Sequence, residues 1–377
     1  MSEAPLRFTV EATAGAAARA GRLVLPHAVV PTPTFMVVGT RAAVRACTVD
    51  QVASTGAGIM LGNTFHLGLK PGGERVAAAG GLHEFSRWPR AMLTDSGGYQ
   101  VFSLAELRSI KEGGVKFRSP YDGAYMELGP ERSIEIQNQL GADILMAFDE
   151  CAPHPAPKDD VARAVDRTTR WAERCIKAHD RPSEQALFGI VQGGVHPDLR
   201  ARSAEALVPM DFPGYAVGGL SVGEGPKLMD ETLAATCPLL PQDKPRYLMG
   251  VGKPEDIVRS VLRGIDMFDC ALPTRNARNG EVFLWPRGYL RLKHARFTDD
   301  HSVIDPTCDC LACGLGVQRS FVRHLLKTGE LAGLTYCSLH NLRFYQRLTA
   351  RLRRAIVAGT LDEFLFEFFG EEGPALE

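Results

Sequence analysis

The sequence predicts an α/β protein built on a (β/α)8 TIM barrel, with an N-terminal β-hairpin and a C-terminal zinc-binding subdomain. The barrel is predicted by eight short apolar runs spread evenly over residues 34–270 and by helix-like stretches between them. Most runs lack apolar–polar alternation, which is typical of parallel strands buried on both faces. Eight such alternations favour a closed barrel over an open doubly wound sheet. The predicted strands are residues 34–38, 58–62, 91–95, 143–149, 187–192, 215–219, 246–250 and 264–269.

The stretches between these runs carry helical periodicity, and several begin with a proline, which suits the first turn of a helix. The clearest predicted helices are residues 130–140, 158–179, 197–207, 226–235 and 254–263. Residues 7–30 resemble a hairpin that could close the bottom of the barrel. The expected division is a hairpin at 1–33, the barrel at 34–279, a zinc-binding unit at 280–350 and a C-terminal helix and tail at 351–377.

Composition narrows the class of protein. The chain has 377 residues, 45% of them hydrophobic, which is enough for a barrel of about 250 residues and further units. No apolar stretch approaches the roughly 20 residues of a membrane span, and no signal-peptide pattern is present. Nine cysteines are too few for a disulfide scaffold and fit a reducing compartment. We therefore expect a cytoplasmic protein without a membrane partner.

Three cysteines, Cys308, Cys310 and Cys313, lie within six residues of the C-terminal unit. Three thiolates and one imidazole form a closed tetrahedral zinc site, in which the metal contributes folding energy. The candidates for the fourth ligand are His340, which we favour, Cys337 and His324. Four protein ligands leave no open position, so the predicted zinc ion is structural and not catalytic.

Positive charge is concentrated near the C-terminus. The whole chain has a net charge of −1, yet residues 271–360 contain 14 Lys/Arg against 6 Asp/Glu. This excess points to a polyanionic partner, and the first part of it directly follows the last predicted barrel strand. A phosphate backbone could thus be guided toward the end of the barrel. The basic residues of that part are Arg275, Arg278, Arg287, Arg291, Lys293 and Arg296.

Three aspartates, Asp95, Asp149 and Asp269, stand where predicted strands end. The carboxyl ends of barrel strands share one face, where TIM-barrel active sites lie. A pair of carboxylates is what substitution at the anomeric carbon of a sugar requires. Gln192 and the Gly218–Gly219 pair stand at the ends of two other predicted strands and could read the edge of a flat heterocycle. The N1–H and exocyclic amine of guanine would suit the Asp149 carboxylate.

The same residues lie in seven motifs whose order resembles that of the tRNA-guanine transglycosylases over nearly the whole chain. The motifs are Leu93-Thr-Asp-Ser-Gly-Gly-Tyr-Gln-Val-Phe102, Phe148-Asp-Glu-Cys151, Val191-Gln-Gly-Gly194, Ala216-Val-Gly-Gly-Leu-Ser-Val-Gly-Glu224, Leu248-Met-Gly-Val-Gly252, Phe268-Asp-Cys-Ala-Leu-Pro-Thr-Arg275 and the cysteine cluster. The resemblance implies a (β/α)8 barrel with a zinc subdomain. It also implies exchange of guanine at the anticodon wobble position 34 of GUN-anticodon tRNAs for a 7-deazaguanine.

Carried over by position, the family's nucleophile falls on Asp269, which would form a covalent ester with the ribose, and its general acid/base falls on Asp95. The resemblance implies that the residues that bind the heterocycle are Ser96, Gly97, Gly98, Tyr99, Asp149, Gln192, Gly219, Leu220, Glu224 and Met249. It implies that the residues that bind the anticodon loop are Gly250, Val251, Gly252, Lys253, Pro254, Glu255, Asp256, Thr274, Arg275, Asn276, Ala277 and Arg278. Zinc would be the single cofactor, with no nucleotide required.

Two positions refine the implied substrate. Val222 and Cys151 resemble the bacterial form, whose small pocket takes the precursor base preQ1, and the family is typically homodimeric. Two other functions stay open. A metal-dependent or retaining hydrolase of small sugars or nucleosides would also use paired carboxylates, but it leaves the basic stretch without a role. An RNA-binding protein without chemistry leaves the nucleophile candidate unexplained.

Overall fold

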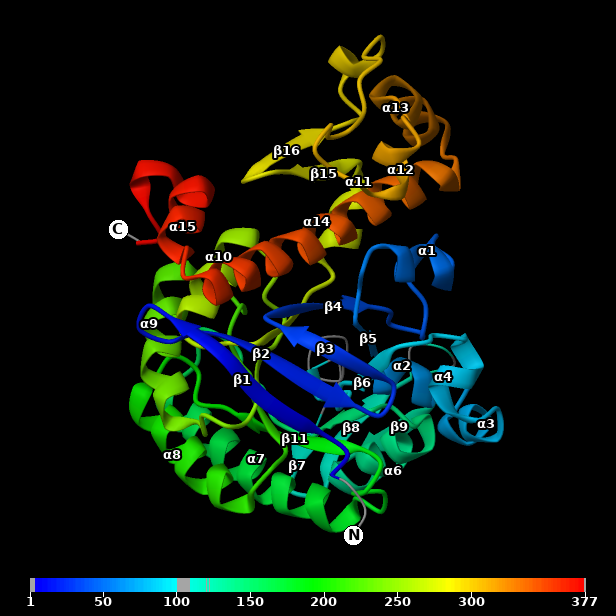
Figure 1. Cartoon of the computed structure of the whole chain (residues 1–377). Helices are drawn as coiled ribbons and strands as arrows, with labels where there is room; N and C mark the ends of the chain where they lie inside the picture. Colours follow the sequence, from blue (N-terminus) through cyan, green and yellow to red (C-terminus); the bar gives the residue numbers. More distant parts are fainter. Residues whose placement is uncertain (1–3, 100–108, 120, 122, 376–377) are drawn as a thin grey trace.

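Eight parallel strands form a closed barrel in the computed structural model, which describes residues 4–99, 109–119, 121 and 123–375 (Figure 1). The strands are β4 (Thr34–Val38), β5 (Ile59–Gly62), β6 (Ala91–Thr94), β10 (Ile144–Met146), β11 (Ala186–Val191), β12 (Gly214–Val217), β13 (Arg246–Leu248) and β14 (Met267–Asp269). Each neighbours the next, and β14 pairs with β4 to close the ring. All eight predicted strands are present, and the predicted barrel is confirmed.

Helices surround the barrel and coincide with the predicted stretches. The five predicted helices are α6 (Pro130–Leu140), α7 (Lys158–Ala178), α8 (Pro197–Leu207), α9 (Pro226–Thr236) and α10 (Pro254–Leu262). Four of them, all but α7, have a proline in the first turn, as the sequence predicts. Shorter helices follow the first strands: α1 (Val49–Ser54), α2 (Thr64–Leu69), α3 (Gly73–Ala78) and α4 (Gly81–Ser86).

An antiparallel sheet closes the amino-terminal end of the barrel, drawn in blue in Figure 1. Its strands are β1 (Arg7–Ala14), β2 (Ala18–Leu25) and β3 (Ala28–Thr32). The predicted hairpin corresponds to β1 and β2, and the third strand extends it. Leu23, Leu25 and Val30 pack against residues inside the barrel such as Ile59 and Met267, so the sheet seals this end with apolar side chains.

A second antiparallel sheet, between β6 and α6, was not predicted. It contains β7 (Ser109–Lys111), β8 (Gly114–Arg118) and β9 (Tyr125–Leu128). Helix α7 holds it through Trp171 and Arg174, whose side chains donate to the Glu112 carbonyl at 2.8 and 2.6 Å. The strands are short and two of them carry exposed residues, so their sequences lack the apolar signal of the barrel strands.

The C-terminal unit is joined to the barrel by one long helix. Its elements are α11 (Leu272–Asn279), β15 (Glu281–Leu284), β16 (Gly288–Arg291), α12 (Leu311–Gly314), α13 (Arg319–Thr328), α14 (Leu331–Ala358) and α15 (Leu361–Phe369). The first half of α14 contains His340, and farther along Gln346 donates to the Phe35 carbonyl of β4 at 2.9 Å. Helix α14 therefore runs unbroken through residues 350 and 351, where the expected division falls (Figure 1). Among the described residues, no helix combines the length and apolar character needed to cross a membrane.

Candidate active site and metal centre

The three strand-end aspartates lie at the carboxyl-terminal end of the barrel, opposite the N-terminal sheet. Asp95 directly follows β6, Asp149 follows β10, and Asp269 is the last residue of β14. The negative charges of Asp269 and Asp95 both raise the pKa of Tyr247, after the larger effect of burial. Both carboxylates are therefore close enough to the buried Tyr247 hydroxyl to affect its pKa. The structure brings together side chains that are far apart in sequence.

The Asp269 carboxylate is held through one of its two oxygens. Tyr247 Oη donates to Asp269 Oδ1 at 2.6 Å, and the Gly250 amide donates to the same oxygen at 2.8 Å. No described residue donates to Oδ2, so this oxygen is available to react. Burial raises the pKa of Asp269, and the two hydrogen bonds only partly oppose that rise.

Asp95 is held by neutral donors from the loop after β5. The Asn63 side-chain amide donates to Oδ2 at 2.5 Å, and the Thr64 amide donates to Oδ1 at 2.9 Å. The Gly97 amide also donates to Oδ1, at 3.1 Å. The sequence analysis did not single out Asn63 and Thr64. They could have been predicted as site residues, because two polar residues directly after a buried strand are the same pattern that identified the aspartates.

Asp149 and Gln192 form a buried polar pair suited to a heterocycle. Gln192 Nε2 donates to Asp149 Oδ2 at 2.6 Å, and Ser96 Oγ donates to Oδ1 at 3.4 Å. Burial raises the pKa of Asp149 to about 6, although the Gln192 and Ser96 hydrogen bonds oppose the rise. A Cβ atom at Gly218 would lie 2.6 Å from Gln192 Nε2, and one at Gly219 would overlap the carboxamide oxygen. Glycine is required there to admit this pair.

Glu224 fixes the loop that follows β12. Its carboxylate accepts from the Ser221 amide and, at 2.9 Å, from the Val222 amide. The peptide between Leu220 and Ser221 places its carbonyl opposite its N–H, so the Leu220 carbonyl points away from Glu224. Ser221 has a φ of 60°, a conformation that such a turn imposes on a non-glycine residue.

Arg200 holds the backbone on both sides of Gln192 and was not predicted from the sequence. Its side chain is fully buried, and it donates to the Gly194 carbonyl at 2.8 Å and to the Val191 carbonyl at 2.9 Å. Burial lowers the pKa of Arg200 to about 10, and the charges of Cys151 and Glu224 only partly oppose that fall. Arg200 lies in the first turn of helix α8, where the sequence alone does not distinguish it from an arginine exposed on the surface.

Comparison with known proteins shows which family the chain belongs to. Residues 14–373 match a family model described as queuine tRNA-ribosyltransferase. The chain belongs to the queuine tRNA-ribosyltransferase family. It is 56% identical to the queuine tRNA-ribosyltransferase of Symbiobacterium thermophilum over 92% of this chain and 86% of that protein. It is 50% identical to the protein of the same name from Bacillus subtilis, over 99% of this chain and 98% of that protein.

In this member of the queuine tRNA-ribosyltransferase family, the predicted metal ligands are assembled and buried. Cys308, Cys310, Cys313 and His340 are each at most 8% exposed. His340 Nδ1 lies 3.5 Å from the sulfur atoms of Cys310 and Cys313. The other ring nitrogen donates to the Phe283 carbonyl at 2.7 Å, which orients Nδ1 toward the thiols. The donor set fits a closed metal site.

The two alternative ligands lie outside that cluster. Cys337 is fully buried among apolar side chains, and burial raises the pKa of its thiol to about 12. His324 is exposed on α13. The structure therefore selects His340 from the three candidates that the sequence left open.

The residues expected to contact RNA differ in accessibility. Gly250, Lys253 and Arg275 are exposed, and Arg278 is half-buried. Glu255 and Asn276 are also partly exposed, whereas Val251, Gly252, Pro254, Asp256, Thr274 and Ala277 are buried. The neighbouring Arg45 and Arg275 contribute to lowering the pKa of Arg278, after the effect of burial, so these three cations lie close together.

Proposed function

We propose that this protein is a tRNA-guanine transglycosylase that works through a covalent ribosyl-aspartate intermediate. Asp269 Oδ2 attacks the ribose C1′ atom, the bond from C1′ to the base nitrogen breaks, and its electron pair leaves with guanine. An incoming base then attacks C1′ and releases Asp269. The observation that carries this proposal is the asymmetric support of Asp269, in which Tyr247 and Gly250 hold one oxygen while the other remains available.

Asp95 would transfer the protons that the exchange requires. It donates a proton to the departing guanine and accepts one from the entering base, which keeps both bases neutral in solution. Its hydrogen bonds with Asn63 and Thr64 come from neutral groups. This permits a carboxylate to cycle between its two protonation states.

The base would bind between Tyr99 and Met249, with its edge against Asp149 and Gln192. Tyr99 is 55% exposed and can stack on an incoming ring. The Gly219 amide and the Leu220 carbonyl, oriented by Glu224, complete the polar contacts. The remaining contacts would come from the backbone of Ser96, Gly97 and Gly98. We further propose that the small side chains of Val222 and Cys151 favour preQ1 as the incoming base.

The anticodon loop would lie along the cations beside Asp269. Arg45, Arg275 and Arg278 form no ion pair with any residue that the structure describes, so their charge is free for phosphates. Farther along, Arg287 and Arg291 pair with Glu372 and Glu281 at 3.5 and 3.0 Å. We therefore assign wobble-position binding to the first group and not to the whole basic stretch.

The metal of the Cys3His cluster is proposed to be zinc, which the thiolate and imidazole donors favour. Its role would be to fold the C-terminal unit, whose other buried residues form only a small cluster. Cys310→Ser should therefore lose the one bound metal and the fixed tertiary structure of this unit. Metal analysis and proteolysis would measure both effects. A metal-free variant that keeps full protection from protease would contradict a structural role.

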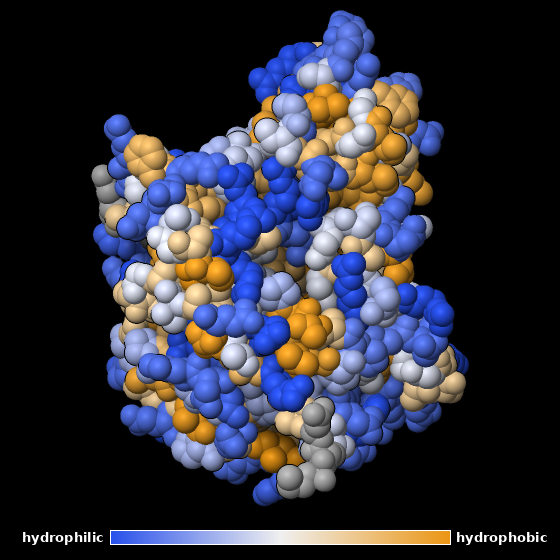
Figure 2. Space-filling model, viewed as in Figure 1, coloured by the Kyte–Doolittle hydropathy of each residue, from blue (hydrophilic) through white to orange (hydrophobic). Residues whose placement is uncertain are grey.

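We also propose a homodimer in the cytoplasm. Leu311, Leu315, Phe321 and Leu331 are between 38% and 67% exposed over α12, α13 and the start of α14. Figure 2 shows apolar residues gathered on this part of the surface. Such a patch is suited to association between copies. All nine cysteines are free, as a reducing compartment requires. Sedimentation of the wild type and of a Leu315→Glu variant would test the dimer.

One assay tests the central proposal. The protein is incubated with a GUN-anticodon tRNA and radiolabelled guanine or preQ1, and label in the RNA is counted. Incorporation is expected, and a tRNA with another base at the wobble position should incorporate none. Release of free guanine without incorporation would instead support the hydrolase, and binding without either reaction would support an RNA-binding protein.

A further inference from the structure

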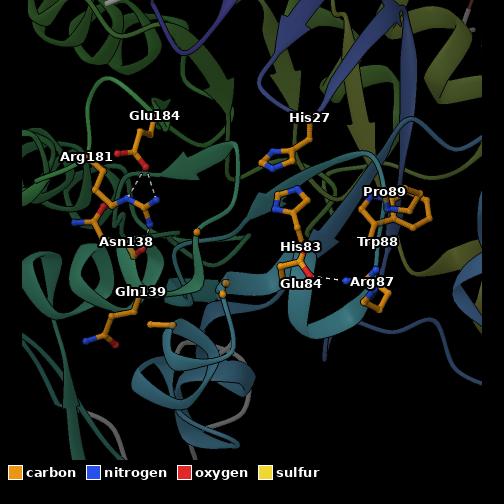
Figure 3. Close-up of a pocket in the computed structure, with 14 residues that line it drawn as sticks. His27, His83, Glu84, Arg87, Trp88, Pro89, Asn138, Gln139, Arg181 and Glu184 are labelled. Atoms are coloured by element: carbon orange, nitrogen blue, oxygen red, sulfur yellow. Dashed lines mark hydrogen bonds and ion pairs between the residues drawn. The ribbon is translucent and has the colours of Figure 1, made fainter.

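A second group of metal-type side chains lies at the opposite end of the barrel, far from the proposed active site. His27 is in the turn between β2 and β3, His83 is in α4, and Asp143 directly precedes β10. The two histidines line a cavity of about 680 Å³ that also contacts Trp88 and Arg181 (Figure 3). None of these residues has a role in the base exchange.

The donor atoms of this group lie as close together as those of a metal site. His27 Nδ1 lies 2.7 Å from Asp143 Oδ1, and His83 Nε2 lies 3.2 Å from Asp143 Oδ2. Two donors bound to one ion at about 2.1 Å lie about 3.0 Å apart at right angles and about 3.4 Å apart in a tetrahedron, which is near these two distances. The three donor atoms all lie within 4.8 Å of one another.

Two further observations point to a ligand. His83 Nε2 is buried and makes no hydrogen bond, although the side chain is only 11% exposed. Asp143 is fully buried, and its carboxylate is oriented by the Met92 amide at 2.8 Å and by the His27 amide at 3.2 Å. An oriented carboxylate beside an unsatisfied imidazole nitrogen is a typical arrangement of metal ligands and their supporting groups.

We propose that His27, His83 and Asp143 form a second metal site, which takes a divalent transition ion such as Zn²⁺ or Ni²⁺. Two imidazoles and one carboxylate are the donors that these ions prefer over Mg²⁺ or Ca²⁺. Unlike the Cys3His cluster, this site supplies three protein ligands and opens into a cavity. Water in the cavity would complete the coordination.

Binding requires one ring to turn. The rings of His27 and His83 are stacked, with centroids 3.6 Å apart and planes 14° from parallel, so their nitrogen lone pairs do not converge. The His27 side chain is 46% exposed on its turn and can rotate without displacing buried atoms. The proton that Nδ1 now donates to Asp143 would move to Nε2, which keeps the ring neutral.

The ion would connect three segments that are distant in the sequence: the turn of the N-terminal sheet, helix α4 and strand β10. Because it binds the folded chain and not the unfolded one, it would stabilise the closure of the barrel's amino-terminal end. The site therefore predicts a measurable stability effect that is independent of base exchange.

The test begins with the full chain carrying only its tightly held metal, and adds Ni²⁺ or Zn²⁺. We expect one additional ion per chain by metal analysis, and a rise in the unfolding temperature of about 3 °C at a hundredfold excess over the dissociation constant. His27→Asn and His83→Gln should each abolish the additional ion. The Asn amide imitates the Nδ1 donor of His27, so it preserves hydrogen bonding to Asp143 while removing a ligand, and the Gln amide places a nitrogen near the position of His83 Nε2.

His324→Gln, an exposed change on α13, is the matched control and should retain the additional ion. No uptake beyond the tightly held metal would overturn the proposal, as would uptake that survives both His27→Asn and His83→Gln. If His83→Gln in α4 fails to fold, His27→Asn still tests the proposal, because the His27 side chain is exposed and its replacement disturbs few packed atoms. Failure of base exchange has no effect on this readout, because metal content and unfolding are measured without tRNA.

Discussion

One aspartate precedes strand β10 and another follows it, and their surroundings shift the pKa values of the two carboxyl groups in opposite directions. Asp143, at the amino-terminal end, faces His27 and His83. Burial alone would raise its pKa, but the nearby histidines and the hydrogen bond from Met92 leave that pKa below the ordinary value. Asp149, at the carboxyl-terminal end, has only the neutral donors Gln192 and Ser96, and its pKa rises to about 6.

Strand β14 shows the same contrast in the partners of its aspartates, although burial raises the pKa of both carboxyl groups. Asp266, just before the strand, forms a buried ion pair with Arg19, whose Nε donates to Oδ1 at 2.9 Å. Asp269, at the other end, is held by the Tyr247 hydroxyl and the Gly250 amide. At the amino-terminal end an arginine or two histidines thus contact each carboxylate, whereas at the carboxyl-terminal end Asp149 and Asp269 accept hydrogen bonds from neutral donors. The partner, more than the residue type, decides whether an aspartate supports the fold or is available for chemistry.

The largest expected effect is on the proposed nucleophile. Asp269→Asn should lower the rate of guanine exchange about 10⁴-fold or more, because the amide oxygen cannot form the ester. The free energy of unfolding should not fall, since burial already disfavours the ionised form of Asp269. Exchange assays and denaturant titration would measure these quantities. Retained exchange would remove Asp269 from the nucleophile role.

Asp266→Asn is the matched change at the other end of β14. It leaves the buried Arg19 guanidinium without its carboxylate, which should cost about 3 kcal/mol in the free energy of unfolding. The exchange rate per folded molecule should stay near that of the wild type. A variant that loses exchange but keeps its stability would show that the two ends do not differ as we infer.

The pH dependence of base binding should follow Asp149. Its pKa of about 6 lies above the ordinary value, so the ionised form that accepts from guanine is lost as pH falls through about 6. The KM for guanine should then rise about tenfold between pH 7 and pH 5. Asp149→Asn should raise KM at pH 7 and remove this dependence. A wild-type KM that stays constant over the range would contradict the role.

The smallest expected effect concerns a cation at the carboxyl-terminal end. Arg19 is fixed by Asp266, whereas Arg278 has no ion pair among the described residues. Arg278→Ala should weaken tRNA binding several-fold and reduce the salt slope of binding by about 1. Arg291→Ala is the control, because Arg291 pairs with Glu281, and it should change the slope less. Equal slopes for the wild type and Arg278→Ala would argue against a phosphate contact.

The sequence predicted the barrel because each strand carries its own local signal. Residues 246–250 and 264–269, for example, contain β13 and β14 as short apolar runs with polar exits. The β7–β9 sheet was missed because its strands are short and two of them carry exposed residues, so their sequences lack the apolar signal of the barrel strands. Arg200 was missed for another reason: a surface arginine and a buried one look alike in a sequence, and only the packing of the loop after β11 distinguishes them.

By itself, the sequence determined the positions of the strands and helices, the aspartates at the strand ends and the spacing of the three cysteines. These features depend on residues that are close along the chain. The pairing of Arg19 with Asp266, 247 residues away, and the place of His340 beside the cysteines instead of Cys337 became visible only in the folded chain. Such partners meet only when the whole core has packed, so the local pattern of apolar and polar residues does not contain them.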